Sequence, residues 1–482
     1  MSAASGRAET VVAGVRLFDP ANAYTDKDLA WEVLRWHADE LRWLTDAQAW
    51  LRRAPGSEVW EIEQGSAAEV AGGLIAEAAR TMPHGDADAE KNSAEGARAF
   101  RYKLLTSSAG LARVRTYLTA SARLARGLHL TMTGLDASPE VLWAGGVPWD
   151  LRASLEGPVR ASLDPGTPHM RSAVCAPVAG PTPLWDAWCE TVWPDEQHRT
   201  WAMRVLSIGL TGYGDRAMPV LWGEPGRGKT ETMGMLADVL GTYATTADTR
   251  LIGAQEPHGS VRLDLLGVRF AMIDESPPSS RVAVENLKAL TGGGWARGER
   301  KYGGQVRFRY SHTLCLTSND EPHVVDDGLR ARLRSIECTG DPTMVREVRK
   351  LIGDLSTSRA WAAERPGVLA QMMRHAAGWL EDRSTADPPL EVAAAVEAAR
   401  REQDPVLDWL DRRTVAGGPT GTDALYLDFQ SFCAQTGVQR APTQNAWARR
   451  LTTSGVAHSK GTGGVRLRGL ALRTPTHAAW GV

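Results

Sequence analysis

The chain has 482 residues, a formal net charge of −2 at pH 7 and 43% hydrophobic residues. This length allows several domains with apolar cores, and the near-neutral charge excludes a polycation, so a nucleic-acid site would need locally segregated charge. Five scattered cysteines lack C-x-x-C pairs and histidine partners, which predicts reduced thiols, no zinc site and a cytoplasmic location. We expect no membrane partner, because no signal-peptide segment or membrane-length apolar run occurs.

The N-terminal part predicts a disordered segment at 1–15 and a mixed α+β domain at 16–180. Trp36, Trp43 and Trp50 are spaced by seven residues, as in a coiled coil. Turn-forming residues between them instead favour short strands in LRWL, AWLRR and VWEIE. We therefore expect the tryptophans to pack in a core, with a base-stacking platform as the less favoured alternative.

An acidic D-x-D pair, Asp86 and Asp88, raises the possibility of a primase metal site. A polymerising site needs its carboxylates on a rigid, apolar strand. Here they lie among Gly, Ala, Lys and Asn, which predicts a solvated loop.

The stretch LWGEPGRGKTET, at 221–232, fits the pattern G-x-x-x-x-G-K-[ST] between an apolar strand and a helical repeat. Glycines let backbone N–H groups surround phosphates, Lys229 meets the outer phosphates, and the Thr230 hydroxyl can ligate Mg²⁺ at a helix N-terminus. The loop therefore predicts an ATP site made of Gly223, Glu224, Pro225, Gly226, Arg227, Gly228, Lys229, Thr230 and Glu231.

An acidic pair follows the apolar run 268–273, which predicts a strand that is buried on both faces. We assign Asp274 to Mg²⁺, through its water, and Glu275 to polarising the attacking water. A helix cap or turn is the alternative for such a pair. The preceding phosphate loop favours the catalytic interpretation.

The next segment, 292–310, is basic and has Gly303 and Gly304 where a hairpin would turn. A basic hairpin on a nucleotide-binding core can hold the phosphates of a strand, whereas a solvated charged loop is the alternative. We expect DNA contacts from Arg297, Arg300, Lys301 and Arg307.

A third buried strand, HTLCLT, ends before Asn319, whose amide can contact the γ-phosphate and the water. Three arginines follow at Arg330, Arg332 and Arg334. Because the chain has one phosphate loop, we expect an arginine from a neighbouring subunit to complete the charge stabilisation, which implies a ring. The hydrophobic pattern does not choose among the three.

The last part predicts a helical linker or subdomain at 346–402 and a separate domain at 403–482. The pattern there gives helices and then a β-wing in SKGTGGVRLRGLAL. From 431 to 482 there are seven Lys or Arg and no Asp or Glu, which favours a DNA-binding domain over a basic protein-docking module.

These elements together resemble superfamily 3 helicases of the poxvirus and phage or plasmid primase-helicase type. The core resemblance is carried by GEPGRGKT, MIDE, NLKALTGGGWARGERKYGGQVRFRYSHTLCLTSND and DDGLRARLRSIE. Lys288 with Thr291, Gly292 and Gly293 looks like the block before the family's DNA-gripping hairpin, although Gly294 stands where the family often has Asp. The likeness places Asn319 at the motif C asparagine and Arg332 at the arginine finger.

Outside the core, LRWLTDAQAWL, VWEIE and GGVPWDLRASLEG look like the family's helicase-associated N-terminal domain, and the tail looks like its winged-helix end. The resemblance implies an α/β fold with an AAA+-like P-loop core at 181–345, a parallel sheet and a C-terminal winged helix. We find no counterpart of the primase domain that precedes the helicase in longer relatives.

The sequence thus predicts an ATP- and Mg²⁺-dependent, ring-forming DNA helicase of a phage, prophage or plasmid replication module. Its expected partners are single-stranded or forked DNA, itself as a homo-hexamer, and a separate primase or other replication proteins. Movement from 3′ to 5′ is implied by the resemblance alone. One alternative is a DNA-stimulated ATPase switch in an assembly or defence system without unwinding, and the least favoured is a primase-helicase that uses Asp86 and Asp88.

Overall fold

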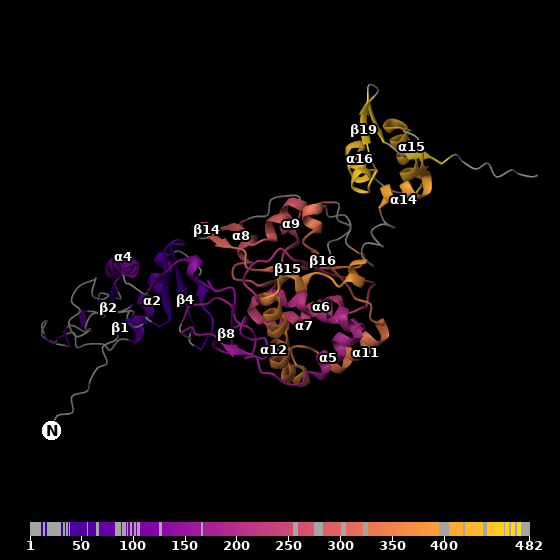
Figure 1. Ribbon diagram of the computed structural model, residues 1–482. Coiled ribbons are helices and arrows are strands. Elements are labelled where there is room, and N and C mark those ends of the chain that lie inside the picture. The colour runs from indigo at the N-terminus through magenta and orange to yellow at the C-terminus, as the bar shows by residue number, and fades with distance from the viewer. Residues whose placement is uncertain are drawn as a thin grey trace, which may run out of the picture. The chain divides into compact units, whose positions relative to one another are not determined.

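The computed structural model divides the chain into two compact units, Met1–Asp387 and Pro388–Val482, which are described separately (Figure 1). No helix among the described residues is long and apolar enough to cross a membrane. The expected domain boundaries at 180, 345 and 402 stay predictions. The structure describes the chain from Val11 to Arg473, with shorter gaps and with the longer stretches 17–29, 82–87, 89–92, 254–258, 274–282, 300–304, 322–325, 395–403 and 437–440 left out.

A five-stranded parallel sheet lies at the centre of the first unit, in the strand order β11-β12-β15-β10-β16. Its apolar strands MPVLW, FAMI and TLCLTS are largely buried, as expected for parallel strands covered on both faces. The predicted α/β class with a parallel sheet is confirmed. The strands are β10 (Met218–Trp222), β11 (Ala244–Thr246), β12 (Phe270–Ile273), β15 (Thr313–Ser318) and β16 (Leu333–Glu337).

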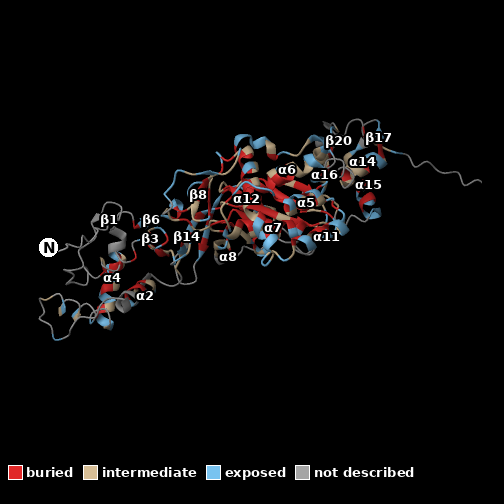
Figure 2. Cartoon of the chain, turned by 90° about the horizontal axis from the view of Figure 1, so that it is seen from below, coloured by how far each residue is buried: buried red, intermediate tan, exposed pale blue. Residues whose placement is uncertain are grey.

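Five helices pack around one another beside this sheet, and Figure 2 shows that buried residues are concentrated there. Side chains cap three of them, because Asp195, Asp341 and Ser358 each accept a backbone N–H at the start of α6, α11 and α12. The helices are α5 (Pro183–Val192), α6 (Glu196–Ser207), α7 (Lys229–Leu240), α11 (Pro342–Ile352) and α12 (Arg359–Glu381).

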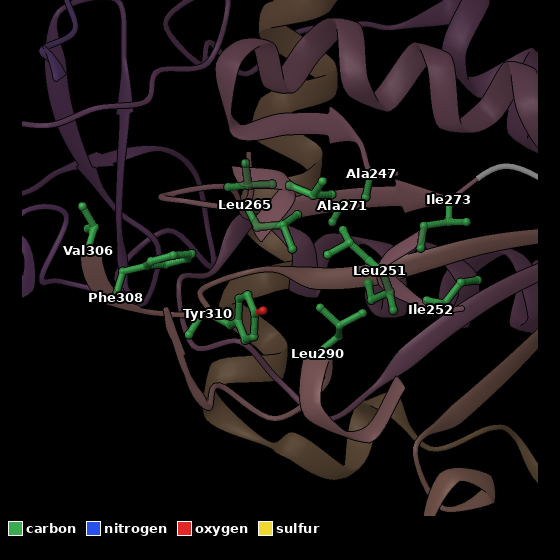
Figure 3. Close-up of a cluster of buried hydrophobic side chains, with 14 of the residues drawn as sticks. Ala247, Leu251, Ile252, Leu265, Ala271, Ile273, Leu290, Val306, Phe308 and Tyr310 are labelled. Atoms are coloured by element: carbon green, nitrogen blue, oxygen red, sulfur yellow. The ribbon is translucent and has the colours of Figure 1, made fainter. Parts of the chain in front are cut away.

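A hairpin formed by β13 (Trp295–Glu299) and β14 (Gln305–Arg309) contributes to a core that also includes β12 and the helix before the hairpin. Figure 3 shows Ala271, Leu290 and Tyr310 in this cluster. The antiparallel pairing confirms the predicted hairpin. The remaining short helices of the first unit, from α8 onward and including the 3-10 helices around the sheet, are α8 (Gly259–Leu263), α9 (Val284–Leu290), α10 (Asp327–Arg330), η3 (Ile208–Leu210), η4 (Gly241–Tyr243), η5 (Thr249–Leu251) and η6 (Arg383–Ala386).

Small sheets precede this core, in the orders β1-β2, β5-β4-β3-β6 and β7-β8-β9. Trp43 and Trp50 are opposite one another on β3 and β4, both buried, with ring centroids 4.9 Å apart. Short strands and core packing are thus confirmed for these two tryptophans, whereas Trp36 lies outside the described residues. Asp88 is exposed in a turn, as expected for a solvated loop, and Asp86 is outside the described residues.

The N-terminal elements are short apart from two helices. β1 and β2 overlap the end of the segment expected to be disordered. The bounds are β1 (Val11–Val12), β2 (Val15–Arg16), β3 (Leu41–Leu44), β4 (Ala49–Arg52), β5 (Glu61–Ile62), α2 (Ala67–Thr81), α4 (Ser108–Leu124), β6 (His129–Leu130), η2 (Met132–Gly134), β7 (Val141–Ala144), β8 (Val147–Asp150) and β9 (Val159–Arg160).

The second unit has its own core around Trp409, Phe429 and Trp447. The segment predicted to form a β-wing contains the antiparallel pair β19–β20, and β18 pairs with β20. The elements are α14 (Pro405–Arg413), β17 (Thr414–Ala416), β18 (Thr420–Gly421), α15 (Thr422–Gln435), α16 (Gln444–Thr453), β19 (His458–Gly461), β20 (Gly464–Leu467) and β21 (Leu470–Leu472).

Candidate nucleotide site and basic hairpin

The loop between β10 and α7 requires glycine at three positions, because Gly223, Gly226 and Gly228 have φ angles of 137°, 83° and 88°. Gly228 is also packed closely, since a Cβ there would lie 2.9 Å from Val192 Cγ2 and 3.0 Å from Trp188 Cζ2. The loop therefore curls tightly against α5 before α7 begins. The loop leads directly into the N-terminus of α7, where free backbone N–H groups favour an anion.

Lys229 and Asn319 meet in a pocket of about 330 Å³ beside this loop. The buried Lys229 Nζ donates to the carbonyl oxygens of Gly223 at 2.5 Å and Glu224 at 3.0 Å, and to Asn319 Oδ1 at 3.1 Å. Thr230 and Glu231 are exposed and line the same pocket. The structure thus brings a lysine, an amide and a hydroxyl together at the N-terminus of α7.

The order of the strands explains how residues far apart in sequence reach this pocket. β15 lies between β10 and β12, with Leu316 paired to Val220 on one side and to Ile273 on the other. Because the three strands are parallel, the chain leaves all of them at the same edge of the sheet. Asp274 and Glu275 follow β12 directly, but both lie outside the described residues.

Two contacts that support the phosphate loop are not predicted from the sequence. Trp188 Nε1 on α5 donates to Thr232 Oγ1 at 2.9 Å, so the indole holds the first turn of α7 as well as packing on the loop. Arg227 Nη1 donates to the carbonyl oxygens of Thr339 at 2.8 Å and Gly340 at 2.9 Å, and its guanidinium also pairs with Glu224. No local sequence signal links Trp188 to Thr232, or Arg227 to Thr339 and Gly340, because these contacts join segments that are far apart in the sequence.

The basic hairpin alternates between buried and exposed side chains, as a strand pair with one covered face should. Arg297 is opposite Arg307 and both are exposed, while Trp295 is 51% exposed with the Arg307 guanidinium 4.3 Å from its ring centroid. This exposed face combines an aromatic surface with positive charge. Of the other predicted DNA-binding residues, Arg300 and Lys301 lie outside the described residues.

Arg332 lies just before β16, at the opposite edge of the sheet from the phosphate loop, since Leu333 pairs with Met218 at the start of β10. Its Nη1 donates to the Lys288 carbonyl oxygen at 2.7 Å and to Thr291 Oγ1 at 2.7 Å. The guanidinium therefore contacts the end of α9, where the hairpin begins. Burial, followed by the nearby positive charge of Arg216, lowers the pKa of Arg332.

The two neighbouring arginines have different surroundings. Arg330 Nη1 lies 3.0 Å from Asp327 Oδ1, and Arg334 donates to the Ala386 carbonyl oxygen at 2.9 Å and to Asp387 at 3.1 Å. Arg334 thus connects β16 to the residues after α12. Arg332 thus forms hydrogen bonds to the segment that leads into the hairpin, and α10, which contains Arg330, also packs against α9.

No family model and no curated protein matches this chain. Among solved structures, the apo structure of the NrS-1 C terminal region (305–718) is 13% identical, covers 93% of this chain and 100% of that chain, and has a TM-score of 0.47. An A form apo structure of the same region gives the same values, and another A form structure gives 10% identity and a TM-score of 0.43. Likeness at this level does not establish a family or a function.

Proposed function

We propose that this protein is an ATP-dependent, ring-forming DNA helicase with an AAA+-like core and a winged-helix-like second unit, acting in the replication of a phage, prophage or plasmid. The observation that carries the proposal is the meeting of Lys229 and Asn319, 3.1 Å apart, in the pocket at the start of α7. The same unit presents a basic hairpin with an exposed tryptophan. A triphosphate site and a strand-binding element on one core are the two parts that a translocating ATPase needs.

Within this proposal, Lys229 binds the β- and γ-phosphates of ATP while the N–H groups of the glycine loop surround them. Thr230 and Asp274 would hold Mg²⁺, which neutralises the charge that develops on the phosphoryl group. Glu275 orients the attacking water, and Asn319 contacts the γ-phosphate. Loss of that phosphate would change the partners of Lys229 and Asn319, and Asn319 lies at the end of β15, the strand that follows the hairpin.

The position of Arg332 supports a ring. β10 is five residues long, which at about 3.3 Å per residue makes the sheet roughly 16 Å deep between Arg332 and the phosphate loop of the same chain. An arginine at the opposite edge can serve only the site of a neighbouring copy. We therefore assign Arg332 to the γ-phosphate of an adjacent subunit, with single-stranded DNA held by the hairpins.

The experiment is a forked-DNA unwinding assay run in parallel with ATP hydrolysis. Lys229→Ala should lower hydrolysis on the order of 100-fold or more and abolish unwinding, because phosphate charge loses its main cationic partner. Lys350→Ala is a matched control, since Lys350 is exposed on α11 and pairs with Glu347. DNA-stimulated hydrolysis without strand separation would instead favour the ATPase switch, and an active Lys229→Ala protein would remove the proposed site.

A further inference from the structure

Trp295 differs from the other tryptophans of the described residues, because it is the only one whose side chain is exposed. It is 51% exposed at the start of β13, whereas Trp43 and Trp50, the pair for which base stacking is the less favoured alternative, are buried. A large apolar ring left in water gains free energy when another group covers it. The surface around Trp295 therefore indicates what kind of group that is.

Arginine side chains surround this ring on the exposed face of the hairpin. Arg309 is directly opposite Trp295 on β14. Arg297 lies two residues further along β13 and is opposite Arg307, and all three arginines are exposed. The two strands contain one acid, Glu299, at the end away from Trp295. The charge of this face thus fits a polyanion, and its aromatic ring fits a polyanion that carries flat apolar groups.

One contact shows that the face of the ring accepts a planar group. The Arg307 guanidinium lies over the Trp295 ring, 4.3 Å from the ring centroid. Trp295 also lines a pocket of about 310 Å³ together with Arg262 and Arg297, so open space adjoins the ring. A nucleobase is planar like a guanidinium and can stack on an indole in the same way.

We propose that Trp295 stacks on one base of the bound single strand, and that this base takes the place of the Arg307 guanidinium on the ring. A cation–π contact at an exposed site corresponds to about two- to fivefold in an equilibrium constant, whereas a base stacked on an aromatic side chain corresponds to about 5- to 150-fold. The exchange therefore favours the base, and the released guanidinium can pair with a neighbouring phosphate. The proposal rests on the proposed function, since it requires the hairpin to bind DNA.

Stacking and phosphate contacts respond differently to the strand and to salt. An abasic strand has the phosphates of oligo-dT and no bases, so it keeps only the electrostatic part of binding. Phosphate contacts release counterions and weaken as the salt concentration rises, whereas stacking on Trp295 releases none. The preference for oligo-dT over the abasic strand should therefore be the same at low and high salt.

The experiment measures the binding of fluorescein-labelled oligo-dT and of an abasic strand of equal length by anisotropy at two salt concentrations. The wild-type protein should bind oligo-dT at least about fivefold more tightly at both. Trp295→Ala should lose most of this preference and keep the salt slope of the wild type. Trp295→Phe should retain part of the preference, because a phenyl ring still offers a stacking face. Tyr117→Ala, a matched loss of an exposed aromatic side chain on α4, should change neither quantity.

Equal affinity of the wild-type protein for the two strands would overturn the stacking proposal, and so would a preference that persists in a folded Trp295→Ala protein. In both cases DNA still binds, so the proposed function survives. If neither strand binds the wild-type protein, the proposed DNA function fails together with the stacking proposal. The wild-type comparison needs no substitution, so a variant that does not fold leaves the test intact.

Discussion

At the scale of single residues, Trp188 supports the phosphate loop from behind. Its ring fills the space beside Gly228 and its N–H reaches Thr232. Trp188→Phe removes the donor and leaves a gap, which should cost about 1–3 kcal/mol of unfolding free energy and raise KM for ATP several-fold. Thermal unfolding and steady-state hydrolysis measure the two effects.

The matched control is Trp447→Phe in the second unit, where a fully buried indole has an Nε1 without a partner among the described residues. It should lose stability with no change in KM for ATP. If Trp188→Phe behaves in the same way, Trp188 contributes to packing and not to the shape of the loop.

His312 gives the fold a predictable sensitivity to acid. It is fully buried just before β15, and burial lowers its pKa to about 4. As pH falls below about 6.5, His312 becomes protonated in the unfolded chain, whereas in the folded chain it stays neutral until about pH 4. The free energy of unfolding therefore falls across this window. The loss accumulates to roughly 3 kcal/mol.

His312→Leu should therefore flatten the decline of unfolding free energy between pH 6.5 and pH 4, measured by urea denaturation at several pH values. Part of the decline should remain, because burial also lowers the pKa of His375 to about 4. An unchanged slope in His312→Leu would mean that His312 is charged in the folded protein.

At the scale of elements, the exposed face of the hairpin should determine the salt dependence of single-strand binding. Arg297 and Arg307 are cross-strand neighbours, so each can neutralise one phosphate. Arg297→Ala or Arg307→Ala should lower the slope of log K against log salt by about 0.7 and leave KM for ATP unchanged. Arg250→Ala, at an exposed arginine paired with Asp248, should not alter the slope. Equal slopes in all proteins would place the strand elsewhere.

Local patterns predict the elements that have their own period or turn signal. The helix after the glycine loop ends at Leu240, just before Gly241, as its spacing indicates, and β15 ends before Asn319. Local patterns do not predict which elements pack against each other. Gly298 packs so closely on α8 that a Cβ would lie 2.3 Å from Leu263 Cδ2. The local sequence of neither segment predicts this contact. The same limit applies to Trp188, whose partner Thr232 lies on another element.

At the scale of the whole molecule, the parallel sheet of the first unit carries the phosphate loop at one end of its strands and Arg332 at the other. The phosphate loop lies at one edge, and Arg332 lies at the other, in contact with the segment that begins the hairpin. An arginine that reaches a neighbour's nucleotide would have to leave these contacts. Binding of ATP between copies would therefore be coupled to the position of the hairpin through Arg332 itself.

This coupling predicts the behaviour of mixed assemblies. If every interface of a hexamer must be intact, an equal mixture of wild-type and Arg332→Ala subunits should retain only about 2% of unwinding activity, the fraction of rings with no altered copy. Independent subunits would instead retain about half. Arg330→Ala is the control, because Arg330 pairs with Asp327 beside the same turn, and its mixtures should stay close to wild type. Activity that falls only in proportion to the Arg332→Ala fraction, with subunit exchange demonstrated, would exclude a shared site.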